Sequence, residues 1–477
     1  MGGLSAAIHA RLEGWDVLVL EKGKVAGGKA AGIQEGNYAL DPGPSIIILK
    51  HFYERVFQKA GRRMEDYLQF TKLPILSRVF FGADPPLDLP ADEIECLRIL
   101  KELSSNDATA FADLLNKIGK VEPLLAKTVY AHPYSDPWQL IDLDLMRFGM
   151  KFDPRKPFKK MVDNLFELPL MRAFFYGFPS YSGQTYSGNC PGAFLIPYYM
   201  LREGLYFPRG GVRSIPIAFE KLALELGVSF RFDSEVTGYQ LGSDKIQSVK
   251  LQSGESISAD AFISNLDYFS WQDLNETKPK SEPSFSYFTL HWGLRQSLPN
   301  LTHHNLVIPE SFERGYEELY AKRRFPTEPI VYLNSTAAAD PEAAPSGCSN
   351  VFAVITCPAK TDGIDWKRET PDFQERVLKT LRQAGIELDF ENADFERVQT
   401  PDYFERAHGN YLGSLYGLDE KQRLWGMFPP PNRAPFAKNL AFCGGSVQPG
   451  AGLPMVVLSG EFAVREISAR TTIQGTK

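Results

Sequence analysis

The first residues of the chain have the types and spacing of a dinucleotide-binding turn. Gly2 and Gly3 precede a run of small and apolar residues, and Glu21 closes the apolar run at 17–20. In a Rossmann βαβ unit, a glycine turn leads into a helix whose N-terminus faces a pyrophosphate, and an acid after the second strand bonds the ribose hydroxyls. Gly3 fits the third glycine of G-x-G-x-x-G, where a missing Cβ lets helix and strand pack closely. We therefore predict that Gly2, Gly3 and Glu21 belong to a dinucleotide site.

The helix that must follow this turn has an apolar face. Leu4, Ala7, Ile8 and Leu12 recur at helical spacing, and Gly14 ends the pattern just before the apolar run. A disordered, glycine-rich N-terminus is the alternative, but it explains neither this spacing nor the position of the acid. Because only the third motif glycine is present, we expect that the first strand and the first two glycines are missing from the chain.

Two further blocks make the nucleotide motif more specific. Glu21-Lys22 is followed by Gly27-Gly28-Lys29 and then by Asp41-Pro42-Gly43-Pro44-Ser45. The chain here resembles the phytoene desaturase family, within the wider amine-oxidase-like flavoproteins, which has an acid-Lys pair, G-G-[RK] and D-x-G-P-S. The resemblance implies FAD rather than NAD, because G-G-[RK] runs along the pyrophosphate and ribityl chain in such proteins. It assigns to the cofactor site Lys22, Gly27, Gly28, Lys29 and Pro44.

The C-terminal region supports the same resemblance. Residues 439–455 read N-L-A-F-C-G-G-S-V-Q-P-G-A-G-L-P-M, which is similar to the carotenoid desaturase C-terminal signature. A proline at position 454 suits a first helical turn, and that helix N-terminus would stabilise negative charge on a reduced flavin. Gln448 stands where the family has His, and an amide cannot titrate near neutral pH. The resemblance assigns to the cofactor site Gly444, Gly445, Gly452, Leu453, Pro454 and Met455.

The middle of the chain resembles the second segment that contributes to the FAD-binding domain in this family. A helix is predicted at 215–226 and a strand at 228–232. The resemblance implies that the backbone N–H and C=O of Val236 recognise the adenine, although Val236 could also be an ordinary strand valine. It also implies that Asn265 lies in the cofactor site. Further strands are predicted at 284–294, 330–333 and 351–356, and we expect them to form the floor of a substrate cavity.

A basic and aromatic segment lies at 147–161. Such a mixture suits a protein that rests on an anionic bilayer, although a solvated basic helix face is the alternative. The basic residues are Arg147, Lys151, Arg155, Lys156, Lys159 and Lys160, and they alternate with Phe148, Phe152, Phe158 and Met161.

Composition limits the remaining functions. The net charge of -6 gives no reason to expect nucleic acid, and no apolar run reaches the roughly 18 residues of a membrane span. The five cysteines show no metal or disulfide spacing and suit a reducing cytosol. His303 and His304 would point different ways on a strand, so we expect no metal. We predict a cytoplasmic chain that associates peripherally with membranes.

Together these patterns predict an α/β fold. We expect a Rossmann-like FAD-binding domain, truncated at its first strand, with an inserted α+β substrate domain and a helical membrane-facing region. The FAD-binding domain is predicted in three parts, with the helical and substrate region and the substrate-domain sheet between them. In chain order, the predicted boundaries are 1–75, 76–203, 204–280, 281–410 and 411–477.

The resemblance implies an FAD-dependent carotenoid desaturase, which removes hydrogen from a hydrophobic C40 polyene to add conjugated double bonds. The sequence of the C-terminal motif favours the hydroxycarotenoid 3,4-desaturase branch. No general base can be named from the sequence; Arg172, by resemblance, and Gln448 are candidates for residues near the substrate. Two alternatives remain open: another flavoenzyme of the superfamily, such as an amine oxidase, a carotene isomerase or a retinol saturase, and a flavin-free lipid-binding relative.

Overall fold

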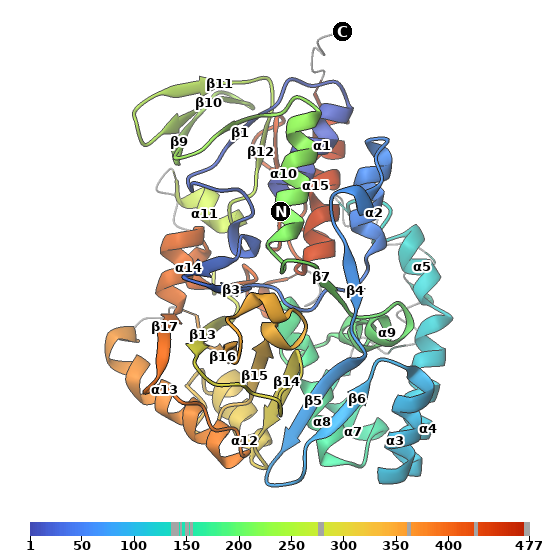
Figure 1. Cartoon of the computed structure of the whole chain (residues 1–477). Helices are drawn as coiled ribbons and strands as arrows, with labels where there is room; N and C mark the ends of the chain where they lie inside the picture. Colours follow the sequence, from blue (N-terminus) through green and yellow to red (C-terminus); the bar gives the residue numbers. More distant parts are fainter. Residues whose placement is uncertain are drawn as a thin grey trace.

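The computed structural model describes residues 1–134, 143, 146–147, 152, 156–274, 281–359, 364–423 and 428–471. In Figure 1 the chain forms an upper part, built around a group of helices and short strands, and a lower part, built around a large mixed sheet. Both chain ends lie in the upper part, so the lower part is inserted between segments of the upper one.

Three helices form the centre of the upper part: α1 (Gly2–Leu12), α10 (Ser214–Glu225) and α15 (Leu453–Ser468). Helix α1 consists largely of small and apolar residues, most of which are buried, so neighbours can pack closely on more than one side. A Cβ at Gly460 of α15 would lie only 2.5 Å from the carbonyl oxygen of Gly2. The close contact between α1 and α15 therefore requires glycine at position 460.

Two pairs of short parallel strands lie beside these helices. Strand β1 (Leu18–Leu20) pairs with β8 (Ser229–Arg231), and β12 (Phe262–Ser264) pairs with β18 (Leu440–Phe442). Among the described residues, β1 and β12 each pair along one edge only, and both line the cavity described below. The helix and strand expected at 215–226 and 228–232 are α10 and β8.

An antiparallel sheet lies at the upper left of the molecule in Figure 1. It consists of β9 (Val236–Leu241), β10 (Ile246–Leu251) and β11 (Ser256–Ser258), and α11 (Tyr268–Asp273) follows β12. Tyr239 stacks on Trp271 with ring centroids 5.1 Å apart, which joins this sheet to α11.

The lower part contains a seven-stranded sheet. Its order is β17 (Ala393–Gln399), β13 (Ser286–Leu294), β16 (Ser349–Cys357), β15 (Val331–Ser335), β14 (His304–Ile308), β5 (Ile75–Phe81) and β6 (Leu87–Pro90). All neighbours are antiparallel except β14 and β5, which are parallel. The strands expected at 284–294, 330–333 and 351–356 are β13, β15 and β16.

The two faces of this sheet have different neighbours. Because side chains alternate along a strand, Phe288 and Leu290 of β13 point toward α13 (Trp366–Gln383) and form one hydrophobic core with it. Tyr287 and Thr289 point the other way and line the cavity. The sheet is therefore the floor of that cavity, as the sequence predicts.

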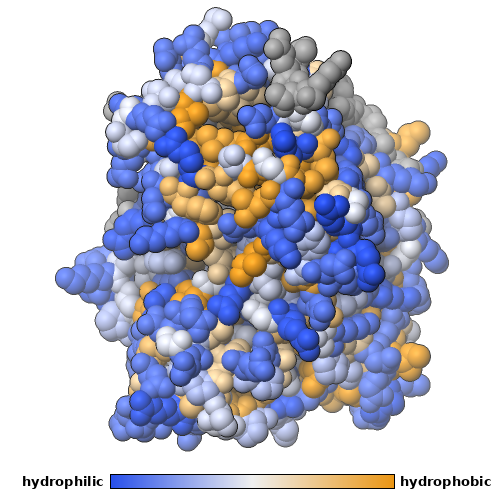
Figure 2. Space-filling view, turned by 45° about the horizontal axis from the view of Figure 1, so that its top comes forward, coloured by the Kyte–Doolittle hydropathy of each residue, from blue (hydrophilic) through white to orange (hydrophobic). Residues whose placement is uncertain are grey.

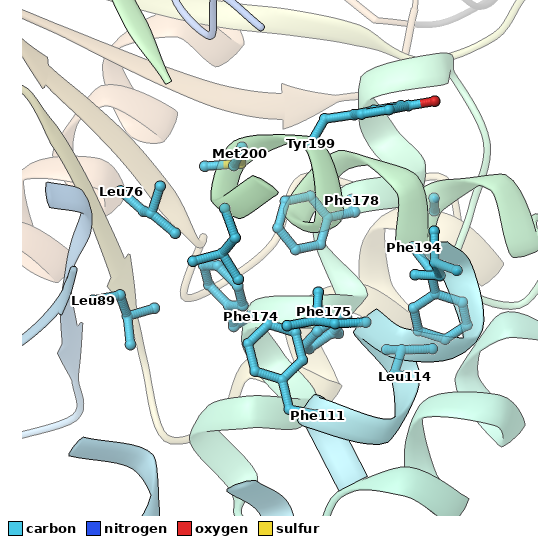
Figure 3. Packing of buried hydrophobic residues seen from close by; sticks show 14 of the residues in the cluster. Leu76, Leu89, Phe111, Leu114, Phe174, Phe175, Phe178, Phe194, Tyr199 and Met200 are labelled. Carbon is cyan, nitrogen blue, oxygen red and sulfur yellow. The ribbon is translucent and has the colours of Figure 1, made fainter. Parts of the chain in front are cut away.

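Helices pack beside the sheet around an aromatic core (Figure 3). They are α2 (His51–Lys59), α3 (Glu93–Leu103), α4 (Ser105–Gly119), α5 (Glu122–Lys127), α7 (Phe158–Leu165), α8 (Pro169–Tyr176) and α9 (Leu195–Arg202). Buried Asp107 of α4 accepts hydrogen bonds from the backbone N–H groups of Glu167 (2.9 Å) and Leu168 (3.0 Å). This carboxylate joins α4 to the turn between α7 and α8.

Shorter elements connect these layers. They are β2 (Ile33–Glu35), β3 (Tyr38–Leu40), β4 (Phe70–Lys72), β7 (Tyr206–Pro208), α12 (Phe312–Tyr316), the one-turn π-helix η6 (Glu317–Ala321) and α14 (Pro401–His408). In the part of the chain that the structure describes, no helix combines the length and the hydrophobicity needed to cross a bilayer.

Candidate functional site

A cavity of about 2030 Å³ extends from the upper part of the molecule to the floor sheet. On the side that faces the viewer in Figure 2, a hydrophobic hollow is framed by hydrophilic residues. The cavity brings together nearly all the residues that the sequence assigns to the cofactor. The predicted residues that line it are Gly3, Glu21, Lys22, Gly27, Gly28, Lys29, Pro44, Val236, Asn265, Gly444, Gly445, Gly452, Leu453, Pro454 and Met455.

Asn265 joins the N-terminal turn to the C-terminal glycines. Its Oδ1 accepts a hydrogen bond from the backbone N–H of Gly3 (2.7 Å), and its Nδ2 donates to the carbonyl of Cys443 (3.1 Å). Gly444 has φ of 116°, and a Cβ there would lie 2.5 Å from Nδ2 of Asn265. Glycine at 444 is therefore required both for the backbone conformation and for this bridge. Gly2 is buried just behind it and does not line the cavity.

Two helices, α1 and α15, begin at the cavity wall. The N–H of Gly3 in the first turn of α1 is bonded to Asn265, whereas no side chain caps the first turn of α15. Neither α1 nor α15 has an acidic residue in its first turn. A helix N-terminus carries partial positive charge and unpaired N–H donors, which suits a phosphate or a reduced flavin edge. The wall therefore fits the charged parts of FAD.

Glu21 has one oxygen available for a ligand. Oε1 accepts a hydrogen bond from the backbone N–H of Gly23 (2.8 Å), which fixes the carboxylate beside the cavity. Its other oxygen has no hydrogen-bond partner among the residues that the structure describes. A carboxylate in this position can accept hydrogen bonds from ribose hydroxyls, the role that the sequence predicts.

A pair of opposite charges lies in the cavity wall: Lys29, whose side chain is exposed, and Asp267, which is buried. Burial lowers the pKa of Lys29, and Asp267 opposes that shift. Burial raises the pKa of Asp267 to about 6. The hydrogen bond from the backbone N–H of Phe269 (3.0 Å) and the positive charge of Lys29 act in the opposite direction and lower this pKa. Lys29 also donates to Oδ1 of Asn410 (3.1 Å). A cation held here can interact with an anionic cofactor.

Sequence reasoning did not identify Asp267, Asn410 or His408, although all three line the cavity. Burial, together with Lys29 and Lys22, lowers the pKa of His408 to about 3, so its imidazole is neutral. Asp267 follows the predicted Asn265 by two positions and accepts from the first N–H groups of α11. That local capping pattern is the one signal that could have indicated it.

The rest of the cavity wall is mostly apolar. Figure 3 shows four of these side chains, Leu76, Phe174, Phe178 and Met200, within the aromatic core. Further apolar residues continue the wall: Ile46, Ile48, Leu49, Leu125, Leu195, Ile196, Leu306, Leu319 and Ile330. Such a wall excludes water and suits a long hydrophobic chain.

Arg172 and Gln448, the two candidates for contact with substrate, do not line the cavity. Arg172 donates from Nε to the carbonyl of Phe166 (2.7 Å), so it holds the turn between α7 and α8. Gln448 is buried and bonds to the backbone of Tyr134. Both side chains are thus engaged with backbone groups outside the cavity lining.

The predicted basic and aromatic segment is divided between surface and core. Lys156 and Lys160 are exposed, whereas Phe152 and Phe158 are buried. Lys159 pairs with Asp163 at 2.9 Å. Arg147 is exposed and Met161 is half-buried, while three members of the segment lie outside the described residues: Phe148, Lys151 and Arg155. The described phenylalanines thus pack inside, and Arg147, Lys156 and Lys160 face solvent.

Within the described ranges, no group of three or more His, Cys, Asp or Glu side chains could hold a metal ion. His303 and His304 do not point apart as expected, because their ring centroids lie only 4.4 Å from each other. His303 contacts the carbonyl of Ser335 (3.2 Å), and His304 contacts the hydroxyl of Tyr332 (2.5 Å).

Comparison with known proteins gives a family match along nearly the whole chain. Residues 1–468 match the flavin containing amine oxidoreductases. A 4,4'-diaponeurosporene oxygenase from Staphylococcus haemolyticus (strain JCSC1435) is 28% identical over 480 residues, covering 98% of this chain and 95% of that protein. The predicted resemblance to amine-oxidase-like flavoproteins is thereby confirmed.

Solved structures share the fold at lower identity. An oxidoreductase from Methanosarcina mazei has a TM-score of 0.62 at 16% identity and covers 96% of each chain. A putrescine oxidase bound to putrescine has a TM-score of 0.59 at 13% identity, covering 98% of this chain and 97% of that one. The fold is therefore the FAD-binding fold of the amine oxidases.

Proposed function

The chain belongs to the flavin containing amine oxidoreductases, and we propose that it uses FAD to dehydrogenate a carotenoid-type polyene. The observation that carries this proposal is the composition of the cavity. One end has the glycines, the helix N-termini and the carboxylate that suit FAD, and the other end is lined by aliphatic and aromatic side chains. The name of the relative at 28% identity also indicates a carotenoid.

When bound, FAD supplies the redox chemistry, because a flavin can accept a hydride from an allylic carbon. The chain supplies position and environment. We propose that Glu21 holds the ribose, that the N-termini of α1 and α15 face the pyrophosphate and the flavin, and that Lys29 provides a nearby positive charge. The apolar wall orients the polyene and excludes water, which strengthens each of these electrostatic interactions.

Desaturation is the form of oxidation that the sequence resemblance favours. A second candidate is oxygenation at the end of a polyene, which the name of the Staphylococcus relative favours. The two reactions share the cofactor and the apolar cavity, but they differ in the mass of the product.

We also propose that the enzyme meets its substrate at a membrane surface. Polyenes of this size dissolve in bilayers, and the exposed Lys156 and Lys160 can approach anionic headgroups. Because Phe152 and Phe158 are buried, this contact would be electrostatic and would not require aromatic insertion.

Anaerobic reduction of the flavin tests the proposed function. The FAD-loaded protein is mixed with liposomes that contain a carotenoid, or with a set of primary amines including putrescine. Loss of flavin absorbance with the carotenoid alone supports polyene oxidation. Loss of absorbance with an amine, and none with the carotenoid, would contradict it.

A further inference from the structure

The loop at 409–417, which follows α14, has a strained and closely packed backbone. Leu412 has a positive φ of 48°, a conformation that residues other than glycine rarely adopt. A Cβ at Gly413 would collide with the carbonyl oxygen of Pro401. Backbone strain persists only where the surrounding structure enforces it, and it is concentrated at active sites and ligand clamps. The loop therefore has a conformation typical of a functional segment.

The start of β13 holds this loop in place. Ser286 donates from its hydroxyl to the carbonyl of Gly413 (2.6 Å), and the backbone N–H of Ser284 donates to the carbonyl of Gly417 (2.8 Å). Both serines are fully buried. The position of the loop is thus fixed by the sheet that forms the floor of the cavity.

Asn410 is the side chain that this loop presents to Lys29. Its Nδ2 donates to the carbonyl of Ser414 (2.7 Å), and its Oδ1 accepts from Nζ of Lys29 (3.1 Å). Because a carbonyl only accepts, the bond to Ser414 determines which end of the amide faces the ammonium group. Asn410 is 4% exposed, and both Asn410 and Lys29 line the cavity. The loop therefore supplies a fixed acceptor for this lysine.

Lys29 has a long, exposed side chain at the cavity, and such a side chain has many rotamers to lose when a ligand binds. The hydrogen bond to Asn410 orders the ammonium group in advance. Burial lowers the pKa of Lys29, and Asp267 opposes that shift, which favours the charged form. Lys29 also acts electrostatically on the amino group of Met1, so its charge lies near the N-terminus of α1.

We propose that Asn410 is a positioning residue for FAD: the loop at 409–417 uses it to hold the ammonium group of Lys29 toward the pyrophosphate. This inference rests on the proposed place of Lys29 beside FAD and adds the segment that fixes it there. Asn410 acts through Lys29 and does not itself touch the cofactor. The floor sheet, through β13 and this loop, thereby fixes a positive charge at the cofactor end of the cavity.

A double-mutant cycle on FAD binding tests this inference. Flavin fluorescence gives the dissociation constants of the parent, Lys29→Met, Asn410→Ala and the double variant. We expect Lys29→Met to weaken FAD binding at least about tenfold, because a charge-assisted contact with the pyrophosphate is lost. Asn410→Ala should weaken it about three- to tenfold, because the ammonium group is no longer ordered in advance. In the Lys29→Met background, Asn410→Ala should change the dissociation constant less than about twofold.

Asn392→Ala is the matched control. It makes the same change at an exposed position that does not line the cavity, and it should bind FAD as the parent does. If Asn410→Ala does not fold, Asn410→Leu replaces it in the cycle, because leucine keeps the size of the side chain and cannot accept a hydrogen bond.

An equal effect of Asn410→Ala in the parent and in the Lys29→Met background would overturn the inference, because Asn410 would then act independently of Lys29. An unchanged dissociation constant in Asn410→Ala would also overturn it. If Lys29→Met binds FAD as the parent does, the proposed place of Lys29 is wrong and the inference fails with it. Flavin reduction by a polyene, measured with the FAD-loaded parent, tests the proposed oxidation separately from each of these results.

Discussion

The side-chain amide of Gln448 pairs with both backbone polar groups of Tyr134. Oε1 accepts from the N–H of Tyr134 at 2.8 Å, and Nε2 donates to its carbonyl at 3.0 Å. Both residues are buried, with exposed fractions of 5%. The amide therefore pairs with the backbone as a residue of a neighbouring strand would, and it joins the C-terminal turn to the segment that follows α5.

We predict that Gln448→Ala destabilises the protein without removing the flavin. The substitution removes two buried hydrogen bonds to the backbone of Tyr134, which should cost about 1–3 kcal/mol. Thermal unfolding of the FAD-loaded protein measures the effect. Gln252→Ala, at an exposed position, is the control and should not change the midpoint. A loss of FAD from Gln448→Ala, with unchanged stability, would show that Gln448 contacts the cofactor directly.

Glu21→Ala should weaken FAD binding by at least about tenfold. A carboxylate that accepts hydrogen bonds from ribose hydroxyls makes charge-assisted bonds, each of which contributes about 1.5–3 kcal/mol. Titration with flavin fluorescence measures the dissociation constant. Glu13→Ala removes an exposed carboxylate near the end of α1 and should bind FAD as the parent does. Equal dissociation constants for Glu21→Ala and the parent would exclude Glu21 from the ribose site.

Glu461 should make the fold sensitive to acid. Its carboxylate, 5% exposed, pairs with Arg55 (2.7 Å), Lys59 (2.9 Å) and Arg465. Burial alone would raise the pKa of Glu461, but hydrogen bonds and charges from His9 and Lys59 outweigh burial and lower it well below the usual range. A lowered folded-state pKa means that the stabilisation is present above the unfolded value of about 4.3 and is lost as the pH falls below it.

The variant Glu461→Gln should therefore lose stability at neutral pH. Because the partners are partly exposed, we expect a loss of about 2 kcal/mol, between the values for surface and buried ion pairs. Its melting temperature should also change less than that of the parent between neutral and acidic pH. Glu255→Gln breaks an exposed pair with Arg231 and is the control. Parallel pH profiles for the parent and Glu461→Gln would contradict this prediction.

The variant Lys156→Glu/Lys160→Glu should bind anionic liposomes several-fold more weakly than the parent. Each basic group near an anionic surface contributes about 1 kcal/mol, and salt screens the attraction. Sedimentation with liposomes measures binding. Lys367→Glu/Lys379→Glu applies the same charge change on α13, on the other side of the lower part in Figure 1. If both double variants sediment with liposomes to the same extent, Lys156 and Lys160 have no special role in membrane contact.

Local motifs predicted which residues would meet at one end of the cavity, because the chemistry of each motif is set by short spacings. The turn at Gly3, the acid at Glu21 and the G-G-K block lie far from Gly444 along the chain, yet they line one cavity. Each block depends on residue types that a flavin nucleotide requires, so each could be recognised separately.

Features that depend on distant pairing could not be predicted in this way. Strand β5 enters the floor sheet by parallel pairing with β14, and no local pattern specifies which distant strand it joins. The burial of Phe152 and Phe158 could not be predicted either, because a pattern of basic and aromatic residues does not specify which of them face solvent. On α7, Phe158 and Val162 lie one turn apart and point into the core.

Product analysis tests the central claim most directly. The FAD-loaded protein is incubated with a carotenoid-type polyene in liposomes, with oxygen or a quinone as electron acceptor, and the product is examined by absorption spectroscopy and mass spectrometry. Polyene desaturation predicts a shift of the absorption to longer wavelength and a mass lower by one pair of hydrogens. An unchanged polyene, with turnover of amines under the same conditions, would contradict it.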